Sequence, residues 1–171
     1  LGITVEGANI LTRSMIVFGQ GALRCHPFLL KEMNAAQTDD LAAFDAALRG
    51  HLRHTLDNLG RSLWYSLTKA KLAVHGSPYT RHYYRHLARL SSHFALLTDY
   101  ALFSLGGNLK QHERFSGRMA DILANLYLCS AVLKHFEEQG EPEADLPLLH
   151  CACDLTINRT QQAMLAAFHN L

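Results

Sequence analysis

Apolar side chains recur along most of this chain at spacings of three and four residues, which is the period of an α-helix. The pattern over 83–101 alternates steps of four and three, which is heptad-like and suits the seam of a helical bundle. No segment shows sustained period-two alternation rich in Val, Ile and Thr. We therefore predict an all-α fold, an up-and-down bundle of about five long amphipathic helices joined by short connections. The longest pattern is one apolar stripe about nine turns long, made by Leu41, Phe44, Leu48, Leu52, Leu56, Leu59, Leu63, Leu67, Ala70 and Val74.

Capping and helix-breaking residues place the ends of the first helices. The first helix is expected over about 8–24, before Pro27 breaks it, and a short helical piece should follow over 28–36. Thr38 is the expected N-cap of the second long helix, with Asp39-Asp40 in its first turn, where the helix dipole favours anions.

Glycine, proline and acidic residues mark the later junctions. Gly76-Ser77-Pro78 should end the second long helix, and Gly106-Gly107 should end the third. An acidic loop over 137–143 follows the fourth, and the last helix should begin around Asp145 with Pro147 in its first turn.

The totals describe an ordinary globular domain. The chain has 171 residues, enough for one domain with a substantial core. Hydrophobic residues make up 49% and charged residues 18%, which is not the balance of a disordered chain. The formal net charge is +1 and no helix-turn-helix or RNA-reading signature occurs, so nucleic acid is not an expected partner.

No targeting or membrane-spanning segment is visible. No stretch reaches the roughly 18 apolar residues of a membrane span, and no basic start precedes an apolar run. Because the chain opens with Leu1 rather than Met, we expect a fragment or a processed product. The cysteines form no Cys-x-x-Cys pair, so we expect reduced, packed thiols in an intracellular, reducing compartment. They are Cys25, Cys129, Cys151 and Cys153.

Positive charge is concentrated in the middle of the chain. Between Arg49 and Arg89 there are eight basic residues and a single acidic one, Asp57. This segment is either a solvated face or a surface for phosphates, of coenzyme A or of a membrane. A related alternative is peripheral membrane binding through an aromatic and basic face, against simple packing of the same tyrosines in a bundle. The residues concerned are Tyr79, Tyr83, Tyr84, Arg81, Arg85 and Arg89.

Eleven histidines raise the question of a metal site. His82, His86 and His93 share one helix face, and His51 and His54 form a second close pair. A metal site would need a third or fourth ligand, usually a carboxylate or thiolate, and the arginines that flank the first group would repel a cation. We therefore expect no metal. Nor does the chain contain Gly-x-Ser-x-Gly or a phosphate-binding Gly-x-x-x-x-Gly-Lys loop.

One carboxylate beside a glycine remains as a catalytic candidate. Glu6-Gly7 opens the first helical pattern. A carboxylate at such a position usually does no more than complement the helix dipole. Its surroundings give it more weight.

The segment over 5–16, Val-Glu-Gly-Ala-Asn-Ile-Leu-Thr-Arg-Ser-Met-Ile, resembles the region around the catalytic glutamate of acyl-CoA dehydrogenases. In that family a Glu-Gly pair opens a helix of the C-terminal helical domain, and an arginine follows at the spacing of Arg13. Similar stretches over 18–27, 105–110, 126–134 and 145–150 extend the resemblance to the large bacterial fatty-acid-oxidation enzymes of the FadE type.

The resemblance implies α,β-dehydrogenation of a fatty acyl-CoA in β-oxidation. In the family a glutamate removes the α-proton while the β-hydrogen leaves as hydride to the N5 atom of FAD, and Glu6 matches that base. Gly7, Ala8 and Asn9 would lie by the flavin. Ala8 departs from the pattern, because a threonine that touches the flavin often stands there.

The resemblance also implies the setting of the chain. Residues 1–171 would form one C-terminal helical domain, with the catalytic-glutamate helix in 1–36 and a branch-specific bundle in 37–171. The domains that supply most of the FAD and acyl-CoA contacts would lie outside it, so the fragment alone should be inactive. Expected partners are a fatty acyl-CoA, an electron-transfer flavoprotein or equivalent acceptor, and further copies of the chain. The expected location is the cytoplasm, with contact to the inner membrane as an option. The alternative is a non-catalytic helical module for oligomerisation or membrane-surface binding.

Overall fold

The computed structural model describes residues 2–71 and 76–169. Leu1 and Val74, both used in the sequence analysis, lie outside the described residues. Within these ranges the chain forms helices and no strand, so the predicted all-α class is confirmed. The elements are α1 (Gly2–Leu11), the π-helical η1 (Thr12–Gln20), α2 (Gly21–Cys25), α3 (Leu29–Gln37), α4 (Leu41–Thr68), α5 (Arg81–Leu105), the 3₁₀ turn η2 (Gly106–Gln111), α6 (Glu113–Glu138), the 3₁₀ turn η3 (Glu143–Asp145) and α7 (Leu146–Phe168).

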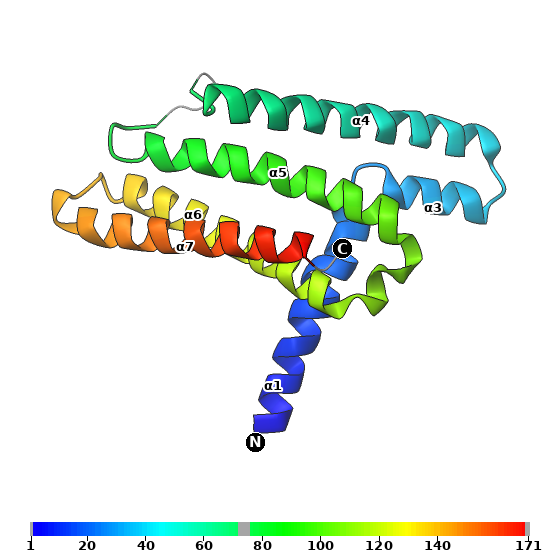
Figure 1. Cartoon of the computed structure of the whole chain (residues 1–171), viewed down its shortest axis with the longest axis horizontal. Helices are drawn as coiled ribbons and strands as arrows, with labels where there is room; N and C mark the ends of the chain where they lie inside the picture. The colour runs from blue at the N-terminus through cyan, green and yellow to red at the C-terminus, as the bar shows by residue number, and fades with distance from the viewer. Residues whose placement is uncertain (1, 72–75, 170–171) are drawn as a thin grey trace.

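The long helices form an up-and-down bundle. In Figure 1, α4, α5, α6 and α7 lie side by side and alternate in direction. The stretch from α1 through η1 to α2 runs without a break and crosses the others, so that α1 projects from the bundle. In the described part of the chain, this stretch and α4 to α7 make the five long helical segments that the apolar patterns predict.

Two predicted boundaries of α4 are wrong. Its N-cap is Asp40, whose carboxylate accepts the backbone N–H of Ala43 at 3.0 Å. Thr38 instead closes α3, because its hydroxyl donates to the carbonyl of Asn34 at 3.1 Å. The helix also ends at Thr68, before the glycine and proline that should have ended it, because the chain turns left-handed at once after Thr68. The predicted ends of α5, α6 and α7 fall within a few residues of the observed ones.

The apolar core lies between α5, α6 and α7. Its fully buried members include Met119, Ile122 and Leu133 of α6. Phe18 of η1 joins the core through edge-on contacts, with ring centroids 6.3 Å from Phe94 and 6.2 Å from Phe115. This side chain fixes the crossing segment, and with it α1, to the bundle.

Helix α4 buries a face of small and polar residues instead of its leucine stripe. Its buried residues are Ala47, Asn58 and Ser62, which are small or polar. The leucine stripe faces away, with Leu56 66% and Leu67 83% exposed. The two faces have the same period but lie on different sides of the helix, so periodicity alone did not say which one packs.

Two of the four cysteines are core residues. Cys129 of α6 and Cys153 of α7 are buried, Cys25 and Cys151 are exposed, and all four are free. The pKa of Cys153 is raised by its hydrogen bond with Cys129 and by burial. No helix in the described ranges is long and apolar enough to cross a membrane.

Candidate functional site

The predicted catalytic helix is exposed. Glu6, Gly7, Ala8 and Asn9 all lie on the surface of α1, which projects from the bundle (Figure 1). A methyl group added at Gly7 would meet no atom within 4 Å. The structure therefore places the four predicted site residues together, on an accessible helix rather than in an enclosed pocket.

Arg13 anchors this helix instead of reaching Glu6. Its guanidinium forms a two-pronged ion pair with Asp121 of α6, in which Nε donates to Oδ1 at 2.6 Å and Nη2 donates to Oδ2. The hydrogen bond with Asp121 raises the pKa of Arg13 despite partial burial. The guanidinium lies over Gly117, one turn before Asp121, where an added Cβ would be in van der Waals contact with it, 3.4 Å from the Cζ atom of Arg13. The arginine at the family spacing thus fixes where α1 leaves the bundle.

These residues do not build a flavin site on their own. A flavin needs a concave pocket that covers most of its surface, and the described residues leave the α1 face open around Gly7. That most FAD contacts come from outside this chain therefore stays an expectation.

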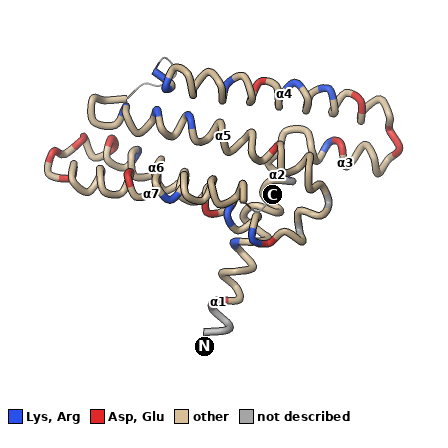
Figure 2. Tube along the Cα trace, in the orientation of Figure 1, with Lys and Arg blue, Asp and Glu red and all other residues tan. Residues whose placement is uncertain are grey.

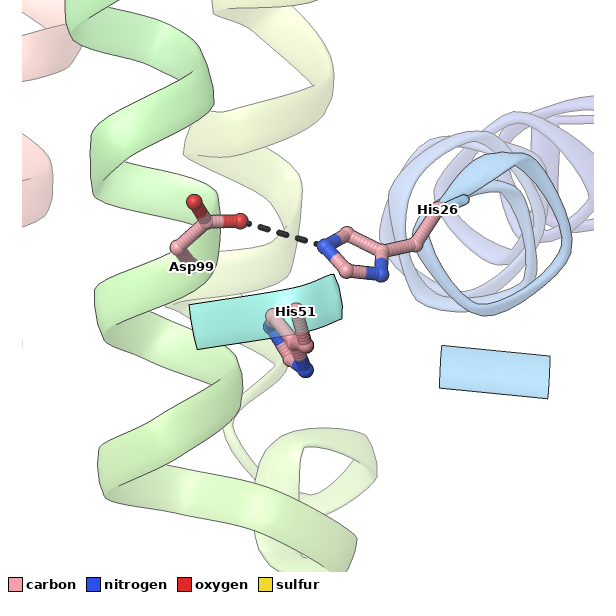
Figure 3. A group of neighbouring side chains, drawn as sticks. All are labelled: His26, His51 and Asp99. Carbon is pink, nitrogen blue, oxygen red and sulfur yellow. Dashed lines mark hydrogen bonds and ion pairs between the residues drawn. The ribbon is translucent and has the colours of Figure 1, made fainter. Parts of the chain in front are cut away.

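A second polar site is buried where α3, α4 and α5 meet. In Figure 3, His26 from the turn after α2 points at Asp99 of α5, and His51 of α4 lies beside them. His26 Nε2 lies 3.3 Å from Asp99 Oδ1, and Asn58 Nδ2 donates to Asp99 Oδ2 at 3.1 Å. His51 Nδ1 donates to Glu32 Oε1 of α3 at 2.8 Å. This cluster is the polar seam that replaces an apolar contact between α4 and α5.

Asp99 is the charged centre of this cluster. Only 5% of the residue is exposed. Burial alone would raise the pKa of Asp99, but the hydrogen bonds from His26 and Asn58 outweigh it, and the pKa is lowered. Electrostatic interactions with His26 and His54 act in the same direction. A carboxylate at this position is therefore ionised at neutral pH.

The nearest ring nitrogens and carboxylate oxygen of His26, His51 and Asp99 lie within 4.8 Å of one another, close enough to hold a metal ion. The hydrogen bonds of His26 favour a different role. Its Nδ1 accepts the backbone N–H of Leu29 at 3.1 Å and that of Phe28 at 3.4 Å. The proton of neutral His26 must then sit on Nε2, which leaves no lone pair there for a metal. The ring instead links the start of α3 to the carboxylate on α5.

Sequence reasoning missed His26 and Asp99 and gave His51 and His54 no partner. Two signals pointed to them. Asp99 stands within the apolar pattern of α5, where a carboxylate needs a buried partner. His51, His54 and Asn58 recur at helical spacing on a face of α4 away from the leucines. The sequence alone could not show that His26, which is distant along the chain, lies against both Asp99 of α5 and this face of α4.

The other histidines and tyrosines have separate roles. Arg89 Nη2 donates to His86 Nδ1 at 3.2 Å, and His93 bonds the hydroxyl of Ser66 at 3.0 Å. Tyr83 is buried and Tyr84 half-buried, and burial first of all raises the pKa of each to about 12. These two rings pack inside the bundle and do not form a membrane-facing aromatic patch.

Comparison with known families gives a match over most of the chain. Residues 23–171 match the family described as acyl-CoA dehydrogenase, C-terminal, bacterial type. No solved structure gave a significant match. The matched range takes in α3 to α7 and the buried polar cluster, and it begins after Glu6 and Arg13.

Proposed function

Because the chain belongs to the bacterial-type acyl-CoA dehydrogenase C-terminal family, we propose that it is the C-terminal helical part of an FAD-dependent acyl-CoA dehydrogenase. The proposed reaction is α,β-dehydrogenation of a fatty acyl-CoA to the trans-2-enoyl-CoA in β-oxidation. The family match over 23–171 carries this proposal. The proposed partners are an electron-transfer flavoprotein or equivalent acceptor and further copies of the same chain.

Glu6 is the proposed general base. The α-proton of a thioester is weakly acidic, so its removal needs a carboxylate within hydrogen-bond reach of the α-carbon. Glu6 is exposed on a helix that projects from the bundle, where a neighbouring domain can bring a substrate to it. Arg13 supports this role indirectly, because its ion pair with Asp121 sets the direction in which α1 leaves the bundle.

FAD belongs to the proposal as the cofactor of the longer enzyme. Gly7, Ala8 and Asn9 offer an open helix edge against which a cofactor held by another domain could lie. Ala8 supplies no hydroxyl, so any polar contact from this edge would come from Asn9 or from the backbone.

We propose a division of roles within the chain. In it, residues 1–36 carry the catalytic helix and residues 37–171 form the bundle that holds it. In this account the bundle braces the catalytic helix through Phe18 and Arg13. We propose that the enzyme works in the cytoplasm, with any contact to the inner membrane peripheral.

The test is to purify the longer protein that carries this chain and the chain of residues 1–171 in parallel. The longer protein should be yellow and convert palmitoyl-CoA to its enoyl-CoA with an electron-acceptor dye, as followed by mass spectrometry. Residues 1–171 alone should be colourless and inactive. A longer protein without flavin and without activity would instead identify a non-catalytic helical interaction module.

A further inference from the structure

A groove lies where α5 and α7 face each other beside the end of α4. It has a volume of about 840 Å³, within the range of small-molecule sites. Its lining residues on α5 run from Arg89 to Tyr100, so the groove follows that helix for roughly 16 Å at the helical rise. This length and volume suit one extended organic molecule.

The polar lining residues of the groove gather at one end. On α5 the polar residues Arg89 and His93 come first along the chain, and on α7 Gln161 comes first. Figure 1 shows that α5 and α7 run in the same direction, so these polar residues meet at one end and the later ones at the other. The groove therefore has a polar end and an apolar end, as a site for an amphiphile requires. The apolar and aromatic residues beyond His93 and Gln161 are Leu96, Leu97 and Tyr100 of α5 and Met164, Leu165 and Phe168 of α7.

Arg89 stands at the polar end without a carboxylate partner. The residue is half-buried, and its Nη2 donates to His86 Nδ1 at 3.2 Å. Among the described residues no carboxylate lies within ion-pair distance of the guanidinium, and none lines the groove. A partly desolvated guanidinium is stabilised by a charged acceptor. The polar end therefore favours an anion.

The surroundings of Arg89 strengthen this preference. Figure 2 shows the basic residues at the end of α4 and in the first half of α5 next to each other, whereas the acidic residues gather at the turn between α6 and α7. Arg89 also lines a neighbouring pocket with Lys69, Lys71 and Arg85, and no carboxylate is among the described residues that line it. The summed positive potential draws an anion to this end of the groove.

We propose that the groove binds one long-chain carboxylate, a fatty acid, with its head at Arg89 and its alkyl chain between α5 and α7. The head of such a molecule is bonded directly to its chain. The groove requires this, because its apolar walls begin directly after the polar residues. This choice of occupant follows from the groove and does not rest on the proposed reaction. The site shares no residue with the Glu6 helix, so it is a second, non-catalytic site.

The charge of the lining matches a head with one negative charge. Of the described residues that line the groove, Arg89 alone is charged at neutral pH, because the pKa of His93 is lowered, first by burial and then by Arg89. His93 and the hydroxyl of Ser66 bond each other at 3.0 Å, which leaves the guanidinium to meet the head. A guanidinium pairs with a carboxylate through two parallel hydrogen bonds.

Displacement of a fluorescent fatty acid from residues 1–171 tests this directly, with each competitor below its micelle concentration. Dodecanoate should displace the probe at micromolar concentration. Two half-ligands are compared with it, 1-dodecanol, which has the same chain without the charge, and acetate, which has the same head without the chain. Each should be needed at a concentration at least ~10-fold higher, because it fills only one half of the site.

A substitution at Arg89 tests the polar end. Arg89→Gln should weaken dodecanoate binding at least ~10-fold and leave 1-dodecanol binding unchanged, because only the carboxylate loses its partner. The control is Arg53→Gln, which removes the same charge from an exposed position of α4 and should change neither affinity.

A pair of substitutions tests the apolar end. Leu165→Gln with Phe168→Gln should weaken the binding of both dodecanoate and 1-dodecanol. Both side chains are exposed, so the fold should survive. Leu148→Gln with Leu155→Gln, at exposed positions of the same helix outside the groove, is the control.

Equal affinities for dodecanoate and 1-dodecanol, or dodecanoate binding that neither Arg89→Gln nor the Leu165 and Phe168 pair changes, would overturn the proposal. So would sedimentation with vesicles of anionic phospholipid in the absence of any binding to soluble dodecanoate, since the surface would then serve a membrane. The longer protein should keep the dependence of dodecanoate binding on Arg89. If Arg89→Gln changes nothing there, a neighbouring domain covers the groove and the proposal fails.

Discussion

Replacing Asp99 with alanine should be among the more damaging single changes in the bundle, although it removes a charge from the interior. The change leaves two buried donors without an acceptor, Nε2–H of His26 and Nδ2–H of Asn58. The side chains of His26 and Asp99 are only 6% and 4% exposed, so water cannot easily replace the carboxylate. Each unpaired buried donor costs about 1–3 kcal/mol, part of which is offset because the carboxylate no longer has to be desolvated.

The net loss should be about 3 kcal/mol in the free energy of unfolding, or a fall of roughly 6–12 °C in Tm for a domain of this size. Asp99→Asn should cost far less, about 1 kcal/mol. An amide at this position can still accept from His26 through its oxygen, and Asn58 can turn its own amide to accept from the new NH₂ group. Urea unfolding followed by circular dichroism measures both values.

Asp121→Ala is the control, because it breaks an ion pair that is largely exposed and should cost at most about 1 kcal/mol. The pH dependence adds a check on Asp99. Its pKa in the folded protein is lowered below the ordinary value of 3.8. The stability gained from its ionisation is present above that unfolded value and is lost as pH falls through the folded pKa. The advantage of the parent chain over Asp99→Asn should therefore shrink in strong acid. Equal costs for Asp99→Ala and Asp121→Ala would refute the view of Asp99 as a buried, doubly bonded centre.

Three further predictions concern other parts of the bundle. Gly50→Ala should destabilise the bundle, because an added Cβ would lie 2.3 Å from a ring carbon of Phe28. Gly60→Ala has open space around it and should stabilise the bundle by about 0.5–1 kcal/mol. Thermal melts of the two variants compare these effects. Phe18→Ala should cost about 3–5 kcal/mol and free the first helical segment, seen as faster amide exchange over 2–25. Arg89→Gln should raise the pKa of His86 while burial keeps it below its ordinary value, and an NMR titration that shows no change would argue against the crowding of positive charge around His86.

The helices were predictable because their apolar period is long and regular. Residues 81–105 and 113–138 carry apolar side chains at every turn, and the structure buries those stripes in the core. Helix α4 shows the limit of this reasoning. Its leucine stripe is the stronger pattern, but the buried residues of α4 are Ala47, Asn58 and Ser62, and Asn58 bonds Asp99 of α5. The buried carboxylate of Asp99 on α5 requires hydrogen-bond donors on the facing helix. This requirement favours the orientation of α4 in which Asn58 faces α5.

The candidate sites also divide into one that the sequence could predict and one that it could not. Glu6 could be proposed from sequence because its neighbours along the chain form a recognisable segment. The polar cluster joins His26, His51 and Asp99 from three separate parts of the chain. No local spacing encodes such meetings, because tertiary packing alone brings these side chains together.

The most direct test of the account is the flavin absorbance of the Glu6→Gln enzyme after anaerobic mixing with an acyl-CoA. Glutamine is nearly isosteric with glutamate but cannot accept the α-proton, so the variant should fold and bind both flavin and substrate. General-base catalysis contributes ~10²–10⁴-fold, and bleaching of the flavin should slow by at least that factor. Bleaching at the rate of the parent enzyme would mean that another group takes the proton and that Glu6 is only a carboxylate near the start of a helix.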